Sequence, residues 1–250
     1  VRLQRFNRFA STIEAIGGLP DYGLMKQMVN TLSTSGGAAP MLSQEGNTVV
    51  GFIPVGAVYL FVRDRNVDTV PELAGKRIAT MDYDKASSFM VDRVGAIQVP
   101  ADLGSIGPKF NNGDVDACYV SAPAYKPFEL QHGIGSSGGI LRAPLAQATL
   151  QVMLRESQFP EGFVAKSRVD LAGRFDDALA VVKKAEAEIP ASSWVDIPAT
   201  TQAEWDLLFQ SVRVQLRDDK KAYDGRMLGV MKQLRCSANG GRAECAENKE

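Results

Sequence analysis

The stretch ELAGKRIATMDYDKASSF, residues 72–89, predicts a strand that ends in a polar turn from which a helix begins directly. KRIATM is the strand, and Asp84 can cap a helix that Gly95 closes. In open α/β sheets, ligands bind at the carboxyl ends of strands, where such turns lie. Asp82 and Tyr83 are therefore the first candidates for contact with a ligand, and Asp84 is either a third or only a helix cap.

The sequence around this stretch has the pattern of a small α/β unit. Strands at KRIATM, AIQVP and VDACYVSA alternate with helical segments, which indicates βαβ units and a parallel sheet. We expect residues 68–148 to form one lobe, and residues 1–67 plus 149–250 to form the other. The predicted fold class is α/β with two lobes, a cleft between them and a helix-rich C-terminal part.

Two long apolar segments are the predicted crossings between the lobes. GNTVVGFIPVGAVYLFVRDR, residues 46–65, contains Pro54 and Gly56 and is interpreted as two strands or one bent strand. The crossings are expected at Val55–Arg63 and near Leu150–Leu154. Beyond them, apolar residues at three- and four-residue steps predict helices, with a capping box at Thr201 starting the helix that contains Trp205.

Composition excludes several classes of function. The 250 residues are 45% apolar and 23% charged with a formal net charge of −1, so bulk charge does not favour nucleic acid as a partner. No apolar run approaches the roughly 20 residues that cross a bilayer. The first residues contain no signal-peptide core and no initiator Met, which we interpret as a mature or truncated chain.

The three cysteines fall into two groups. Cys236 and Cys245 flank the polar, glycine-rich segment RCSANGGRAEC, whereas Cys118 lies in an apolar strand. A close pair across a flexible loop favours a disulfide and an oxidising compartment. The alternative is two free thiols in a cytosolic tail. A metal site is not predicted, because two cysteines and the distant His132 do not supply four ligands.

Motifs for catalysis or for a cofactor are weak. HGIGSSGG has the glycine spacing of a dinucleotide loop, but it follows a predicted helix and precedes a predicted strand, which is the reverse of the required order. His132, beside the same glycine-rich turn, is the one histidine of the sequence, so a Ser-His or Cys-His catalytic pair would have to use it. We therefore predict no enzymatic activity and no cofactor.

Several short segments resemble those of a known family. VDTVPELAGKRIAT, GAIQVPADLG and KFNNGDVDACYV occur in the order and spacing of the solute receptors of TRAP-type (DctP-like) transporters, over about residues 51–120. RFNRFASTIEAIGGLP, AVYLFVRD, MDYDK and the final cysteine pair resemble an AdeT-like branch of solute-binding proteins, whose members carry labels tied to efflux or aminoglycoside resistance. The resemblance implies a type II-like periplasmic binding protein that lacks its first βαβ unit here. Its implied partners are a small-molecule solute and a membrane transporter or efflux component.

The sequence departs from the TRAP receptors at one functional position. Ala79 stands where those receptors have the arginine that clamps a carboxylate, and a guanidinium is what such a clamp needs. We therefore expect a cationic or neutral polar solute, bound by hinge closure without bond making. The alternative is an interaction protein that has kept the fold and lost its ligand. The candidate ligand-binding residues are Val55, Gly56, Tyr59, Asp82, Tyr83, Asp84, Ser121 and Tyr125.

Overall fold

The computed structural model describes residues 6–250. Its sheet is built around one long strand, β2 (Asn47–Val62), which pairs with β1 (Ser43–Gln44), β5 (Ala117–Ser121), β6 (Gly139–Leu141) and β7 (Ala146–Arg155). The other strands are β3 (Arg77–Met81), β4 (Ile97–Ala101) and β8 (Trp194–Val195). The strand order is β4-β3-β5-β2-β6-β8, with β1 and β7 also paired to β2. Strand β3 pairs in parallel with β4 and β5, as predicted, whereas β2 is antiparallel to each of its partners.

Strand β2 is one bent strand rather than two. Its register with β7 shifts between Val49 and Gly51 and again between Pro54 and Gly56. Gly56 has φ +124°, and a Cβ there would lie 2.7 Å from Cδ of Pro123. Glycine is therefore required at this bend.

The bend keeps both halves of β2 in the same sheet. The first half pairs with β7, and residues 58–62 pair with β5. A separate lobe for residues 68–148 implied a sheet of its own for Arg77–Met81; instead, β2 connects this strand to Val49–Ile53 in one continuous sheet. The boundaries of the lobes at residues 67/68 and 148/149 stay a prediction.

Helices cover both faces of the sheet. The α-helices are α1 (Arg8–Ser11), α2 (Tyr22–Thr34), α3 (Lys85–Arg93), α4 (Ile106–Asn112), α5 (Gln131–Ile134), α6 (Phe163–Gly173), α7 (Phe175–Glu186), α8 (Ala199–Asp218) and α9 (Gly225–Ala238). The short 3₁₀ helices are η2 (Thr12–Glu14), η3 (Ala39–Leu42), η4 (Pro71–Leu73), η5 (Ala122–Ala124), η6 (Glu156–Gln158), η7 (Ala191–Ser193) and η8 (Ala243–Ala246).

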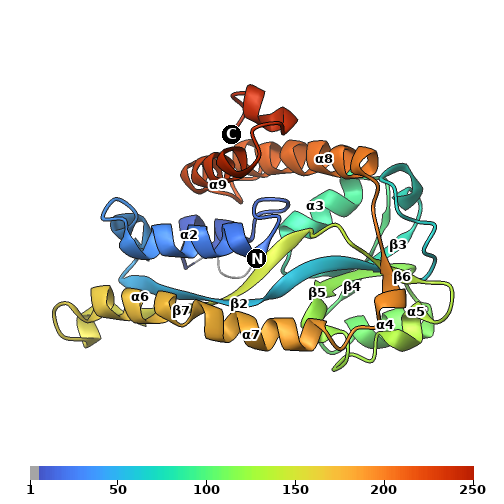
Figure 1. The fold of residues 1–250 in the computed structure, drawn as a ribbon, viewed down its shortest axis with the longest axis horizontal. Coiled ribbons are helices and arrows are strands. Elements are labelled where there is room, and N and C mark those ends of the chain that lie inside the picture. Colours follow the sequence, from blue (N-terminus) through green and yellow to red (C-terminus); the bar gives the residue numbers. More distant parts are fainter. Residues whose placement is uncertain (1–5) are drawn as a thin grey trace.

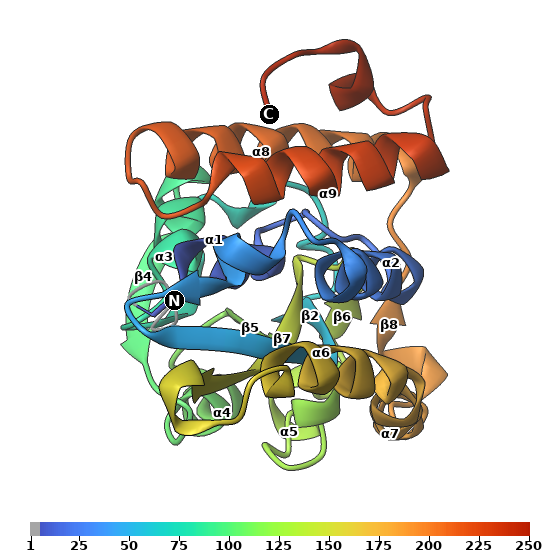
Figure 2. The same ribbon diagram turned by 90° about the vertical axis from the view of Figure 1, so that its left-hand side faces the viewer.

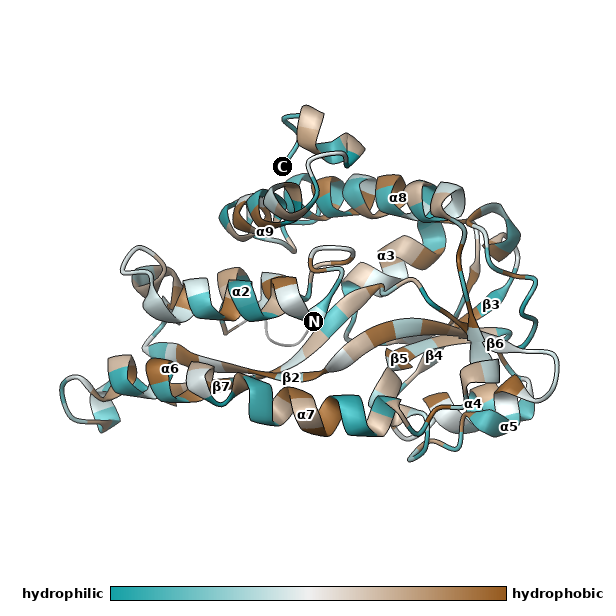
Figure 3. Cartoon of the chain, in the orientation of Figure 1, coloured by the Kyte–Doolittle hydropathy of each residue, from teal (hydrophilic) through white to brown (hydrophobic). Residues whose placement is uncertain are grey.

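Figures 1 and 2 show these helices in layers. Helices α2 and α3 lie on one face of the sheet, and α4, α5, α6 and α7 lie on the other. Helices α8 and α9 form an outer layer, in which α8 packs on α3 and α9 packs on α2. Figure 3 shows mostly apolar strands and a mixture of apolar and polar residues along α8 and α9, as expected for helices that bury one face.

Alternating residues of the strands enter two separate apolar clusters. Leu60 belongs to the cluster under α2, α3, α8 and α9, whereas Phe61 belongs to the cluster on the opposite face of the sheet. This follows from the two-residue period of a strand. Among residues 6–250, no helix combines the length and apolar character needed to cross a bilayer.

Helix caps explain where several helices begin. Asp21 accepts a hydrogen bond from the amide of Leu24 (2.8 Å) and caps α2. The capping box predicted at Thr201 is wrong, because α8 already begins at Ala199, directly after Pro198. Proline there sets the helix start two residues before the predicted cap, since it does not need a backbone donor at that position.

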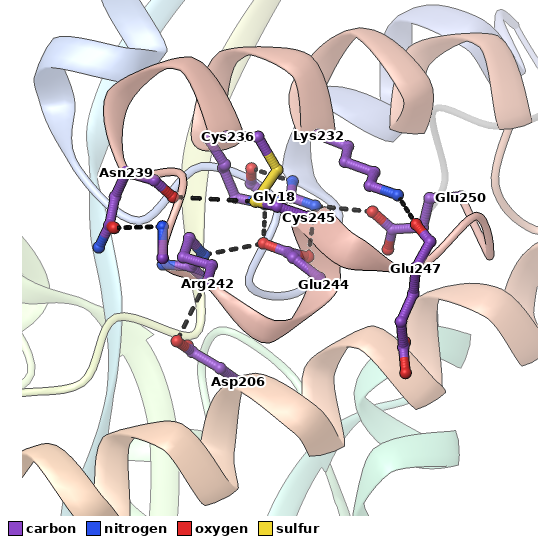
Figure 4. Close-up of a disulfide and its surroundings, with 12 residues drawn as sticks. Gly18, Asp206, Lys232, Cys236, Asn239, Arg242, Glu244, Cys245, Glu247 and Glu250 are labelled. Carbon is purple, nitrogen blue, oxygen red and sulfur yellow. Dashed lines mark hydrogen bonds and ion pairs between the residues drawn. A yellow bond between two sulfur atoms is a disulfide. The ribbon is translucent and has the colours of Figure 1, made fainter.

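The C-terminal segment is joined to α9 by a disulfide. Cys236 and Cys245 are bonded, and Cys118 is a buried free thiol, which confirms the predicted pairing (Figure 4). Burial raises the pKa of the Cys118 thiol, so it is a structural rather than a reactive cysteine.

Four buried charges lie beside the disulfide. Arg213 and Arg235 each pair with Glu244 and Glu250, and the four side chains are between 0% and 7% exposed. Arg242 adds a hydrogen bond to Glu244 (2.8 Å; Figure 4). Burial by itself would raise the pKa of Glu244, but the hydrogen bonds and charges of the arginines outweigh it and lower that pKa to about 2.

Candidate functional site

A partly open cavity of about 130 Å³ lies between α3 and the strands of the sheet. A cavity of this size holds a molecule roughly as large as benzene. Both predicted lobes contribute walls, because residues from 73–148 and residues from the rest of the chain face it. The lining residues are Glu14, Ile16, Val58, Leu60, Leu73, Ile78, Asp84, Ala86, Ser87, Met90, Val91, Val94, Tyr119, Leu145, Ala146, Gln147, Ala148 and Tyr223.

Glu14 is the most deeply placed carboxylate of the cavity. It ends η2, and its Oε1 accepts hydrogen bonds from the amide (2.8 Å) and the hydroxyl (2.6 Å) of Thr149 on β7. Burial is the main cause that raises the pKa of Glu14; the hydrogen bonds from Thr149 lower it, and the negative charge of Asp84 adds a smaller increase. A cation beside this carboxylate would favour its ionised form.

Asp84 supplies a second carboxylate, from the start of α3. It caps α3 by accepting hydrogen bonds from the amides of Ala86 (3.1 Å) and Ser87 (3.2 Å). The hydroxyl of Tyr119 on β5 lies nearby and accepts a hydrogen bond from the amide of Met81 (3.1 Å). Asp84 is thus both a helix cap and a wall of the cavity.

The turn that contains Ile16 forms another wall and is held from several sides. The hydroxyl of Tyr223 accepts a hydrogen bond from the amide of Ile16 (3.3 Å), and Arg213 donates a hydrogen bond to the carbonyl of Ile16 (2.9 Å). Arg235 donates to the carbonyl of Gly18 (2.7 Å). The buried charge cluster therefore fixes the position of one side of the cavity.

Gln147 on β7 adds an unpaired acceptor. Its Nε2 donates to the carbonyl of Leu19 (3.2 Å), but its buried Oε1 has no hydrogen-bond partner among residues 6–250. Gln147 is 1% exposed and lines the cavity, and an unpaired buried acceptor costs free energy, so a ligand donor that reached this oxygen would be stabilised.

The charged groups of the cavity wall have one sign. Its lining contains the carboxylates of Glu14 and Asp84 and, within residues 6–250, no lysine, arginine or histidine. Hydroxyls of Ser87, Tyr119 and Tyr223 complete a wall that is otherwise apolar. Such a wall attracts a cation or a neutral hydrogen-bond donor and repels an anion.

Of the predicted ligand-binding residues, Asp84 lines this cavity. Asp82 is exposed, and Tyr83 is 37% exposed. Val55 and Gly56 lie at the bend of β2, outside the lining. Of the three residues in the strand-to-helix turn, Asp84 therefore contributes to the cavity wall, whereas Asp82 and Tyr83 do not.

Two of the other predicted residues, Tyr59 and Tyr125, lie toward the opposite face of the sheet. Tyr59 packs edge-on against Trp194 (ring centroids 4.9 Å apart), and Tyr125 is buried in the second apolar cluster. Burial raises the pKa of Tyr59 to about 12. Ser121 ends β5 without lining the cavity. Alternation along β2 places Tyr59 on the face of the sheet opposite Leu60 and the cavity, so the structure does not bring the predicted residues to one cavity with Asp84.

Glu14, Gln147 and Tyr223 were missed by sequence reasoning. Glu14 lies in ASTIEAIGG, where one acidic residue between apolar ones was a usable signal. Gln147 and Tyr223 gave no comparable signal, because their role depends on the residues that the fold places beside them.

Comparison with known proteins identifies the family. The family model described as "Solute-binding protein AdeT 1/2" matches residues 1–250. The chain belongs to this family. It is 35% identical to "Probable solute-binding protein AdeT1" of Acinetobacter baumannii over 252 residues, which cover 100% of this chain and 82% of AdeT1. Identity to AdeT2 of the same organism is 27% over 201 residues, covering 78% of this chain and 82% of AdeT2.

Solved structures show that this AdeT-family chain has the two-lobed fold of TRAP periplasmic solute-binding proteins. A protein from Desulfovibrio desulfuricans with bound sn-glycerol-3-phosphate superposes with a TM-score of 0.74 at 13% identity, covering 94% of this chain and 76% of that one. One from Ralstonia eutropha with bound (S)-2-acetolactate gives 0.73 at 11%, with the same coverage. The ectoine-binding protein of the TeaABC transporter of Halomonas elongata gives 0.68 at 12%, covering 90% and 78%.

Proposed function

We propose that this chain is a periplasmic binding protein that captures a small cationic or neutral polar solute in the cavity under α3 and presents it to a membrane transporter. Membership of a solute-binding family and the TRAP receptor fold support capture of a solute. The observation that carries the proposal is the cavity with carboxylates and hydroxyls in its wall.

The lining distinguishes this solute from those of the structural neighbours. Malonate and sn-glycerol-3-phosphate, bound in two of them, are anions that need a cationic partner. Here Ala79 is fully buried in the apolar cluster across the sheet, and carboxylates face the cavity instead. Selection of organic acids therefore does not transfer to this chain.

Closure of the lobes on the solute is expected to bend β2 and β7. These strands pair with each other and lie between the regions predicted as lobes. Gly56, at the bulge, has backbone dihedrals that other residues rarely adopt, which favours it as one hinge position. The partner by this proposal is a membrane transporter of the kind that TRAP receptors serve; an efflux component is the other partner that the sequence suggested.

A thermal-shift screen tests the proposal. Amines, alcohols, sugars and carboxylic acids of about six to eight non-hydrogen atoms should be compared at equal concentration. A solute at 100 times its Kd stabilises the folded state by about 2.7 kcal/mol, so the binding class should raise the melting temperature clearly. We expect amines or neutral polar solutes in this class and no carboxylic acid.

Two matched variants locate the binding. Val91→Trp fills the cavity from α3, and the control Val181→Trp changes a side chain of α7 that is 71% exposed. The first should abolish the thermal shift and the second should leave it unchanged. Absence of a shift with every solute would favour the ligand-free interaction protein, and an unchanged shift in Val91→Trp would place the solute elsewhere.

A further inference from the structure

The polar groups of the cavity are mostly hydrogen-bond acceptors. Within residues 6–250, the hydrogen bonds that Glu14 accepts end on Oε1, which leaves Oε2 to a ligand. The Oε1 of Gln147 is buried and unpaired. The oxygen of Tyr223 accepts a hydrogen bond from the backbone of Ile16, and its hydroxyl hydrogen is left as a donor. A ligand that satisfies Glu14 and Gln147 must bring donors.

Glu14 and Gln147 act from the same side of the cavity. The partner of Glu14 is Thr149, two residues after Gln147 on β7, and residues two apart on a strand share a face. A carboxylate and an amide oxygen are therefore neighbours at one end. Asp84 is less available, because its Oδ1 and Oδ2 already accept hydrogen bonds from the first turn of α3.

The rest of the wall is apolar. Leu73, Ile78, Met90, Val91 and Val94 surround the remaining space, and they would leave the hydroxyls of a sugar without partners. The space therefore suits a compact hydrocarbon body with one polar end. A cation at that end would compensate the charge of the half-buried Glu14 carboxylate, which an uncharged donor cannot do.

We propose that the ligand is a small amphipathic primary amine, with its ammonium group between Glu14 and Gln147 and its hydrocarbon body against α3. This inference rests on the proposed function and narrows the solute from cationic or neutral polar to a monoamine. The ammonium donates to Oε2 of Glu14 and Oε1 of Gln147. The body of the ligand fills the space that a six-membered carbon ring would occupy.

Isothermal calorimetry at pH 8 with three probes of one shape tests this. Cyclohexylamine should bind, cyclohexanol should bind at least tenfold more weakly, and cyclohexanecarboxylate should not bind. Glu14→Gln keeps an acceptor for Thr149 and should weaken cyclohexylamine at least tenfold, with cyclohexanol changed less than threefold. Gln147→Leu should also weaken the amine. Glu161→Gln, the same change on an exposed loop, should leave all affinities unchanged.

The outcomes separate the inference from the proposed function. Tighter binding of the alcohol or the carboxylate, or an amine affinity that Glu14→Gln leaves unchanged, overturns the amine assignment while solute binding stands. If Glu14→Gln does not fold, the affinity of Gln147→Leu for cyclohexylamine replaces it as the test: an unchanged affinity overturns the amine assignment. Failure of these probes and of every solute in the thermal-shift screen overturns both.

Discussion

Replacing Arg235 with methionine tests whether the buried charge cluster stabilises the fold. Arg235 is fully buried and donates to both oxygens of Glu244 (2.7 and 2.8 Å) and to Glu250 (2.6 Å). The substitution leaves two buried carboxylates with one buried arginine, Arg213. Breaking a buried ion pair from one side costs about 3–5 kcal/mol. Because Arg213 still contacts both carboxylates, we expect the lower end, about 3 kcal/mol.

Urea unfolding at pH 7 measures this loss. With a slope of about 3 kcal/mol/M, the midpoint should fall by about 1 M. The control Arg174→Met removes an exposed pair with Asp170 on α6 and should cost about 0.3–0.5 kcal/mol.

A double variant supplies the sharper test. Arg235→Met combined with Glu244→Leu leaves one buried arginine and one buried glutamate, so the charges balance again. Part of the lost stability should therefore return relative to Arg235→Met alone. A loss below 1 kcal/mol in the single variant, or a double variant that shows the full sum of both losses, would refute the reasoning.

Three further predictions concern the disulfide, the bend of β2 and acid stability. Cys236→Ser opens a bond between residues 9 apart in sequence and should cost about 2–3 kcal/mol in urea unfolding; thiol titration of the non-reduced wild type should find one thiol, Cys118, only after unfolding. Gly56→Ala forces a side chain into a positive-φ position and should cost at least about 1–3 kcal/mol, whereas Gly229→Ala, in open space within α9, should stabilise by about 0.5–1 kcal/mol. The pKa of Glu244 is lower in the folded state, about 2 against 4.5, so its contribution is complete above pH 4.5 and disappears as the pH falls toward 2; unfolding free energies measured across this range should depend less on pH in Glu244→Gln.

The sequence by itself determined the local elements of this protein. Asp84 predicted the start of α3, because a cap depends on amides two or three residues away. The pairing of Cys236 with Cys245 followed from a short polar loop. The family resemblance gave the fold class, because its motifs are contiguous segments.

Only the tertiary structure decided which side chains share the cavity. The cavity wall combines residues that are far apart in the sequence: Glu14 lies more than a hundred positions before Gln147, and Tyr223 lies further along the chain. They meet because η2, β7 and the segment before α9 pack around α3. Asp82 and Tyr83 were predicted to contact a ligand because they follow a strand. The direction in which each side chain points depends on the exact residue at which β3 ends and on the elements that pack beside it. A shift of one residue along a strand exchanges the faces of the sheet, and no local pattern specifies which face encloses the cavity.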